Sequence, residues 1–195
     1  MNETDRLLAR ALELGSIKYG EFTLRSGQKS TYYFDGRLLS MDPEGAYLIG
    51  RIFVPLVAAS GAEAVGGPAT AAIPVVSAIS LTSHLNGGGI PAFFVRGEAK
   101  DHGTKQLVEG PVKKGARVAV IDDVCSTGGS IFEAIKAVEE MGCKVVFTGT
   151  LVDRHQGGSD ELRKRGYPFV PLMEATPQGK VEVVRQHATQ QGARK

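Results

Sequence analysis

The fold of this chain is decided by the stretch VAVIDDVCSTGGS, residues 118–130. It opens with four apolar, mostly β-branched residues, a pattern typical of a buried strand in a parallel sheet. Two carboxylates and a short run of glycines and hydroxyl residues follow, and apolar residues then recur at helical spacing: Ile131, Ala134, Ile135 and Val138. The stretch therefore predicts a strand, a loop and a helix. In an open α/β sheet, ligands bind beyond the carboxyl ends of such strands.

The loop has the composition of a phosphate-binding site. Gly128 and Gly129 let backbone N–H groups approach a ligand closely, and the start of the helix offers unpaired N–H donors and a positive dipole end. Ser126, Thr127 and Ser130 add hydroxyl donors. The alternative is a capped strand-to-helix junction without a ligand, but two acids and several small polar residues exceed what a cap requires.

Asp122 and Asp123 would repel a phosphate, so they must serve another part of the ligand. A carboxylate suits a cis-diol such as the 2- and 3-hydroxyls of ribose, and it can stabilise positive charge that develops at a sugar carbon. Consecutive residues of a strand face opposite sides, so at most one of the two faces the sugar unless the chain has begun to turn. A phosphate beside a diol predicts a ribose 5-phosphate.

These residues resemble the PRPP-binding signature of the type I phosphoribosyltransferases. That signature is two acidic residues, two variable positions, two hydroxyl residues, a glycine, a variable position and a hydroxyl residue. The resemblance implies an α/β fold, with a central mostly parallel sheet flanked by helices and a small N-terminal hood. It assigns PRPP binding to Asp122, Asp123, Val124, Cys125, Ser126, Thr127, Gly128, Gly129 and Ser130. The signature does not name the base that accepts the ribose.

Composition fits one domain over residues 1–195, in which about 1–40 supply a helix and the hood and 176–195 form a polar tail. A net charge of +2 is too weak to argue for a nucleic-acid or membrane surface. No apolar run approaches a membrane span, and the charged start lacks the apolar core of a signal peptide. Cys125 and Cys143 lack metal-ligand spacing, so we expect reduced thiols and a cytoplasmic protein.

Periodicity and punctuation residues predict the remaining elements. Helices are expected over 2–19, which Gly15 or Gly20 could end, over 42–61, which Asp42 caps ahead of Pro43, and over 70–86 and 159–166. An interruption near Pro74 is left open. Strands are expected over 64–68, 91–95 and 144–152, with an edge strand over 167–172. Residues 186–195 are expected to fray.

Residues 20–35 contain two short β-like runs around Ser26-Gly27, which predicts an antiparallel flap. Most of its aromatic residues should pack beneath it, although one of Tyr32, Tyr33 and Phe34 could stack on a flat base. The segment resembles the amino-terminal part of orotate phosphoribosyltransferases. The resemblance assigns orotate binding to Arg25, Phe34, Ser126 and Arg154. Arg25 stands where many members carry lysine, and Thr31 replaces a proline.

Residues 96–105 form a polar, basic segment that is too long for a tight connection and is typical of a functional lid. The alternative is a solvated loop. In orotate phosphoribosyltransferases the matching run closes over the pyrophosphate of PRPP and on the neighbouring subunit. Arg96, Lys100 and His102 match that run, whereas Gly97 replaces a usual lysine. In the preceding pyrophosphate loop, Thr70 and Ala71 replace the tyrosine and lysine of one subgroup.

Arg154 follows a predicted core strand, where it could clamp a carboxylate through two parallel hydrogen bonds. The family places an arginine here against the carboxylate of orotate. The alternative is a surface ion pair with Asp153.

The resemblance implies an orotate phosphoribosyltransferase of pyrimidine biosynthesis, with orotate and PRPP as substrates. Lys100, His102 and Asp123 would carry catalysis, and Mg²⁺ would be held mainly by PRPP without a dedicated protein site. The enzyme would be a homodimer with lid residues shared across the interface, and it would bind neither nucleic acid nor membrane. Two alternatives stay open: a phosphoribosyltransferase for another base, and a PRPP-sensing regulator without turnover.

Overall fold

A central sheet organises the computed structural model, which describes residues 2–23, 29–97 and 107–185. Within these residues the sheet has seven strands in the order β5-β4-β3-β6-β7-β8-β9. They are β3 (Ala64–Pro68), β4 (Ala92–Val95), β5 (Val108–Glu109), β6 (Arg117–Cys125), β7 (Lys144–Asp153), β8 (Phe169–Ala175) and β9 (Val181–Val183). Strands β4, β3, β6, β7 and β8 are parallel to one another. Strands β5 and β9 lie at the two edges and run antiparallel to their neighbours. The expected mostly parallel sheet is confirmed.

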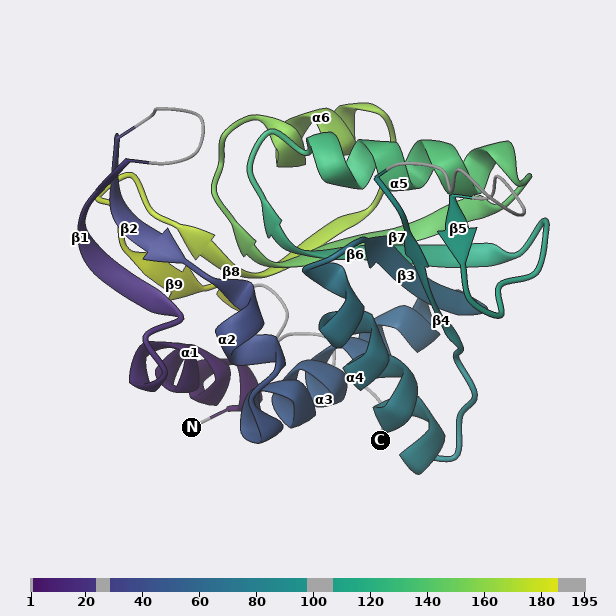
Figure 1. The fold of residues 1–195 in the computed structure, drawn as a ribbon, viewed down its shortest axis with the longest axis horizontal. Helices are drawn as coiled ribbons and strands as arrows, with labels where there is room; N and C mark the ends of the chain where they lie inside the picture. The colour runs from purple at the N-terminus through teal and green to yellow at the C-terminus, as the bar shows by residue number, and fades with distance from the viewer. Residues whose placement is uncertain (1, 24–28, 98–106, 186–195) are drawn as a thin grey trace.

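Helices cover both faces of the sheet (Figure 1). One face carries α1 (Glu3–Glu13), α2 (Gly36–Ser40), α3 (Pro43–Ala59) and α4 (Ala72–Leu85), and the other carries α5 (Gly129–Glu140) and α6 (Gly158–Lys164). Side chains of the central strand β6 alternate between the two cores. Ala119 and Ile121 pack in the cluster formed with α3 and α4, whereas Val118 and Val120 pack with α5.

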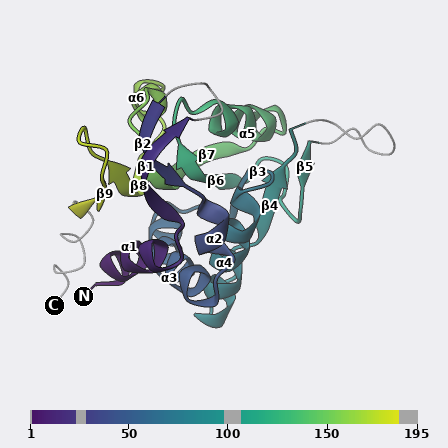
Figure 2. The same cartoon turned by 60° about the vertical axis from the view of Figure 1, so that its left-hand side comes forward.

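The expected flap is a two-stranded antiparallel sheet, which we call the hood: β1 (Ile17–Thr23) and β2 (Lys29–Phe34). Its turn, residues 24–28, lies outside the described residues. The hood stands beside the β8–β9 end of the sheet in both views (Figure 1, Figure 2). The backbone N–H of Val181 donates to the hydroxyl of Tyr19 at 3.1 Å, which ties the hood to β9.

The structure resolves two points about the helices that the sequence left open. The first helix does not reach Tyr19: it ends at Glu13, and Gly15 with φ +65° turns the chain into β1. A left-handed φ is inexpensive for glycine, so this is an efficient helix stop. The possible interruption at Pro74 is absent, because this proline lies in the first turn of α4, where its missing N–H costs no hydrogen bond.

The expectation that residues 167–172 form an edge strand is wrong, because β8 pairs with β7 on one side and with β9 on the other. Strand β9 lies inside the segment expected to be a polar tail. Strand β5 was not expected at all; it pairs with β4 directly after residues 98–106, which lie outside the described residues. Both strands are short, and their pairing depends on neighbours in space.

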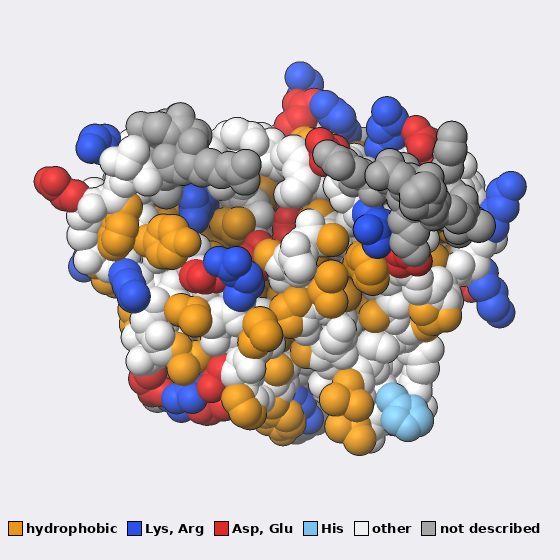
Figure 3. Space-filling model, viewed as in Figure 1, with side chains coloured by type: hydrophobic (Ala, Val, Ile, Leu, Met, Phe, Trp, Pro, Cys, Tyr) orange, Lys and Arg blue, Asp and Glu red, His pale blue; other side chains and the backbone are white. Residues whose placement is uncertain are grey.

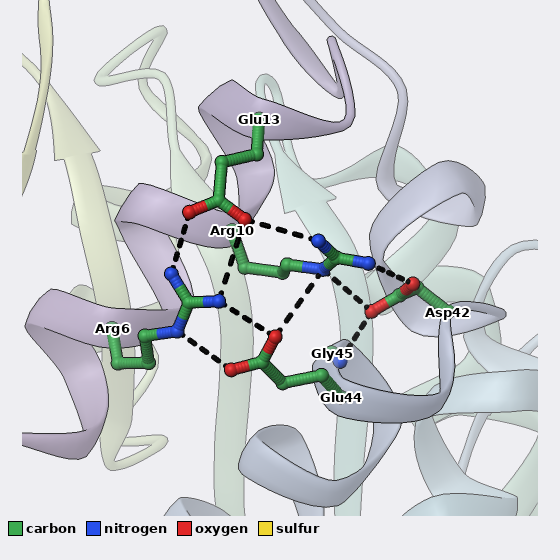
Figure 4. Close-up of polar contacts among 6 residues, drawn as sticks. All are labelled: Arg6, Arg10, Glu13, Asp42, Glu44 and Gly45. Atoms are coloured by element: carbon green, nitrogen blue, oxygen red, sulfur yellow. Dashed lines mark hydrogen bonds and ion pairs between the residues drawn. The ribbon is translucent and has the colours of Figure 1, made fainter.

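A network of charged side chains fastens α1 to the start of α3 (Figure 4). Arg6 contacts Glu13 and Glu44, each at 2.6 Å, and Arg10 contacts Glu13 at 3.0 Å and Asp42 at 2.7 Å. Asp42 also caps α3, as expected, by accepting from the backbone N–H of Gly45 at 2.9 Å. The Arg10 guanidinium and this backbone bond lower the pKa of Asp42 to about 2.

In the described parts of the chain no helix is both long and apolar enough to cross a membrane. Cys125 and Cys143 are free and buried. The cytoplasmic location stays a prediction.

Candidate active site

The predicted phosphate loop joins β6 to α5. Cys125 is the last residue of β6, and Gly128, with φ +82°, precedes the first residue of α5. No side chain caps this helix, so its first-turn N–H groups remain available as donors. Thr127 and Gly129 are exposed. The geometry is that of an anion cradle at the carboxyl end of the central strand.

A second turn, between β7 and α6, is hydrogen-bonded to the phosphate loop. The backbone N–H of Arg154 donates to the carbonyl of Cys125 at 2.8 Å, and that of Gly158 donates to the carbonyl of Ser126 at 3.0 Å. A Cβ at Gly158 would lie 2.5 Å from the backbone nitrogen of Gly128. Only glycine permits this approach. Sequence reasoning missed Gly158, although a glycine pair after a core strand was a visible signal.

The two acids face opposite sides of the sheet, as their consecutive positions predicted. Asp122 faces α5: its Oδ2 accepts from the Ser130 hydroxyl at 2.7 Å, and its Oδ1 accepts from the backbone N–H of Asp123 at 2.8 Å. Asp123 lies on the other face, against Gly36 at the start of α2. Both side chains are buried, with residue exposures of 4% and 9%.

Burial makes the charged forms of this pair expensive. Burial first, and then the charge of Asp123, raises the pKa of Asp122 to about 7, and the Ser130 hydrogen bond opposes the rise. Burial also raises the pKa of Asp123, and hydrogen bonds with the Asp122 side chain and the Val124 backbone oppose that rise, with a smaller contribution from the positive charge of Arg154. The pair is therefore suited to hydroxyl donors or to a cation that arrives with a ligand.

Gly36 is a further residue that sequence reasoning missed. It is the first residue of α2, directly after Asp35, which caps the helix and pairs with Arg37 at 2.9 Å. A Cβ at Gly36 would lie 2.5 Å from Oδ2 and 2.7 Å from Cβ of Asp123. The glycine therefore makes the space in which the Asp123 carboxylate sits.

Arg154 lies one residue beyond β7, beside the phosphate loop. Its guanidinium carbon is 5.6 Å from the centre of the Tyr32 ring, and its Nε is buried with no hydrogen-bond partner in the parts of the chain that the structure describes. The alternative of a surface ion pair with Asp153 is wrong. Asp153 is fully buried and accepts from the backbone N–H of His155, and Arg154 has no ion pair within the described ranges.

The other residues assigned to the base are placed differently. Phe34 is 5% exposed and packs in the core cluster shared by the hood and α3, so its role in binding stays a prediction. Arg25 lies outside the described residues. Ser126 is half-buried in the phosphate loop, next to the turn that carries Arg154.

The predicted pyrophosphate side is a cavity of about 490 Å³ lined by Ala69, Thr70, Phe94, Arg96 and Gly97. The backbone N–H of Ala69 donates to the carbonyl of Val95 at 2.7 Å, which joins the loop after β3 to the end of β4. Arg96 reaches Glu109 at 3.9 Å. Lys100 and His102 lie outside the described residues.

These features converge because their strands are parallel. The loops that follow β3, β4, β6 and β7 leave the same edge of the sheet, and they bring together Thr70, Arg96, the phosphate loop and Arg154. Among the described residues, no group of three or more His, Cys, Asp or Glu side chains could hold a metal ion.

Comparison with known proteins agrees with this geometry. Residues 58–170 match the model of the phosphoribosyl transferase domain. The chain is 39% identical over 170 residues to an orotate phosphoribosyltransferase of Aquifex aeolicus, which covers 86% of this chain and 93% of that protein.

Solved structures show the same likeness. The orotate phosphoribosyltransferase of Mycobacterium tuberculosis in complex with Fe(III) dicitrate superposes with a TM-score of 0.78 at 35% identity, covering 89% of this chain and 97% of that one. A structure of the Mycobacterium tuberculosis enzyme in complex with PRPP gives a TM-score of 0.74 at 31% identity, with coverages of 89% and 96%.

Proposed function

Since this chain belongs to the orotate phosphoribosyltransferase family, we propose that it transfers the 5-phosphoribosyl group of PRPP to orotate. The products are orotidine 5-phosphate and pyrophosphate, and the reaction belongs to pyrimidine biosynthesis. One observation about the site supports orotate as the base. Arg154, whose buried Nε has no hydrogen-bond partner among the described residues, stands beside a phosphate-type loop, as expected for a site that takes a base with a carboxylate.

The reaction needs no nucleophilic side chain. The bond from C1 of the ribose to pyrophosphate lengthens, and pyrophosphate leaves with the electron pair while the ring gains oxocarbenium character. A ring nitrogen of orotate attacks C1 from the opposite face, and the proton that this nitrogen loses is taken up by the departing pyrophosphate. The protein must hold both partners in line and stabilise the charges that develop.

Each group of residues has one task in this proposal. The loop from Val124 to Ser130 holds the 5-phosphate through backbone N–H groups and hydroxyls, and Arg154 holds the orotate carboxylate. Because the two acids face opposite sides of the sheet, only one carboxylate, that of Asp123, holds the ribose hydroxyls, and Asp122 fixes Ser130 of the loop. The burial of Asp123 against Gly36 supports a fixed carboxylate near the sugar. Arg96, with Lys100 and His102, neutralises the departing pyrophosphate.

Magnesium fits this donor set as an ion that arrives with PRPP. A buried acid supplies oxygen ligands, which this ion prefers, yet one carboxylate alone leaves most of its coordination to the substrate and water. When bound, the ion would neutralise charge on the pyrophosphate. Because the acids face opposite sides of the sheet, Asp123, on the face of α2, is the residue that would contribute to holding it.

We further propose that the enzyme acts as a homodimer. Support comes from large hydrophobic side chains that remain exposed over α2, α3 and α4 (Figure 3). They are Leu38, Met41, Tyr47, Leu81 and Leu85. Such a gathering is typical of a surface that another chain covers.

The activity is tested by following four bases side by side with PRPP and Mg²⁺: orotate, uracil, adenine and hypoxanthine. We expect turnover of orotate with release of one pyrophosphate per orotate consumed. We expect Arg154→Gln to raise KM for orotate by about tenfold or more, because a charge-assisted bidentate contact is lost.

Turnover of adenine or hypoxanthine in place of orotate would favour a phosphoribosyltransferase for another base. PRPP binding without turnover of any base would favour the regulator. Lys136→Gln, on the exposed surface of α5, is the matched control for removal of a positive charge and should leave KM for orotate unchanged.

A further inference from the structure

The side chain of Arg154 has one aromatic contact and one unpartnered buried donor among the described residues. Its backbone is fixed by the bond to Cys125, and its guanidinium lies over the ring of Tyr32. Among the described residues Arg154 forms no ion pair, although its positive charge slightly lowers the pKa of Asp123. The buried Nε is thus left without a partner in the described part of the protein. An unpaired buried donor is costly unless a ligand satisfies it.

Tyr32 is held firmly in place. The residue is 7% exposed and belongs to the core cluster that the hood shares with α3 and β7. The Ser30 hydroxyl donates to the carbonyl of Tyr32 at 2.6 Å and accepts from its N–H at 3.3 Å. Across the hood, Tyr32 pairs with Tyr19, which is itself tied to β9. The ring is therefore a rigid platform.

A platform of this kind orients a guanidinium. A cation over an aromatic face within about 6 Å of the ring centre is attracted by the ring, by roughly 2 kcal/mol where water is excluded. Among the described residues, the buried Nε–H of this guanidinium has no hydrogen-bond partner. The N–H donors of a guanidinium form a planar fork that matches a carboxylate.

We propose that Tyr32 is a positioning residue that orients Arg154 for the carboxylate of the base, and that it thereby contributes to selection of carboxylated bases. This inference rests on the proposed function. Tyr32 acts through Arg154 and is not itself assigned a contact with the substrate.

Steady-state kinetics of Tyr32→Leu, Tyr32→Phe and Tyr19→Leu test the proposal. Loss of the ring should raise KM for orotate by roughly five- to thirtyfold, the equivalent of 1–2 kcal/mol, while kcat and KM for PRPP change little. Tyr32→Phe keeps the ring and should behave as the wild type. Tyr19→Leu removes the hydroxyl that ties the hood to β9 but leaves the Tyr32 ring in place, so it should raise KM for orotate less than Tyr32→Leu does.

Coupling to Arg154 separates positioning from a general structural role. In the Arg154→Gln background, adding Tyr32→Leu should cause no further rise in KM for orotate. The same rise in both backgrounds, or an equal rise in KM for PRPP, would overturn the proposal. If Tyr32→Leu does not unfold cooperatively, Tyr32→Met takes its place, with the same expectations.

The two proposals fail in different ways. Absence of orotate turnover by the wild-type protein would remove the proposed function. Wild-type turnover of orotate with an unchanged KM in Tyr32→Leu would remove only the role of Tyr32.

Discussion

At single residues of this site, burial disfavours the charged form of a carboxylate while hydrogen bonds favour it. Asp122 shows this most clearly, since both of its oxygens accept hydrogen bonds and its pKa is nevertheless raised. Below pH 4 the carboxyl is protonated in both folded and unfolded chains. Between pH 4 and about 7 the unfolded chain loses the proton that the folded chain keeps, so the contribution of Asp122 to stability falls as pH rises.

Asp122→Asn should therefore raise the melting temperature of the ligand-free protein at pH 8 by a few degrees, the shift expected for about 1–2 kcal/mol. The amide still accepts from the Asp123 N–H and can donate to the Ser130 hydroxyl. The gain should shrink toward pH 4. Thermal unfolding across this range is the measurement, and Asp160→Asn on the exposed face of α6 is the control. A gain that is constant with pH would contradict the raised pKa.

Gly36→Ala tests whether the position of the Asp123 side chain affects binding of PRPP. The new methyl group would overlap the Asp123 side chain, which must shift. We expect KM for PRPP to rise about tenfold, as for an overpacked contact costing ~1.4 kcal/mol. Gly89→Ala, which meets no atom within 4 Å, is the control. An unchanged KM for PRPP in Gly36→Ala would show that the position of Asp123 is not critical.

Among the helices, strands and loops, those whose structure depends on residues close in sequence could be predicted from the sequence. The phosphate loop depends on Gly128 and its neighbours, and the start of α3 depends on the Asp42 cap and Pro43. Strands β5 and β9 depend on backbone pairing with distant residues, so short-range patterns could not reveal them. The contact between Tyr32 and Arg154 joins the hood to the end of β7 and has no local signal.

The network between α1 and α3 gives a prediction about the helices. Arg10→Met keeps the aliphatic stem but removes the contacts to Asp42 and Glu13, and it should lower the melting temperature at pH 7. Because the folded-state pKa of Asp42 is depressed, its stabilisation is present above pH 4 and is lost as pH falls through about 2.

The difference between Arg10→Met and wild type should therefore shrink between pH 4 and 2, and also in 1 M salt, which screens exposed charges. Lys136→Met, which removes one exposed pair with Glu140, should change the melting temperature little at any pH. Equal effects of the two variants at pH 7 would mean that the network adds nothing beyond an ordinary surface pair.

For the molecule as a whole, the exposed apolar surface over α2 to α4 predicts self-association. Leu85 and Met41 are 74% and 73% exposed, so their substitution should leave the monomer fold intact. Light scattering after size exclusion should give a dimer for the wild type and a monomer for Met41→Glu/Leu85→Glu. Leu12→Glu on α1 is the control and should remain dimeric. A monomeric wild type, or a dimer unaffected by both charges, would contradict this use of the surface.

The central claim is that the 5-phosphate of PRPP binds where β6 gives way to α5. A crystal structure of the protein with PRPP tests this directly. We expect density for the 5-phosphate against the backbone N–H groups of residues 126–130, with ribose hydroxyls near the acid pair. PRPP bound elsewhere, with this loop empty in an intact fold, would contradict the account.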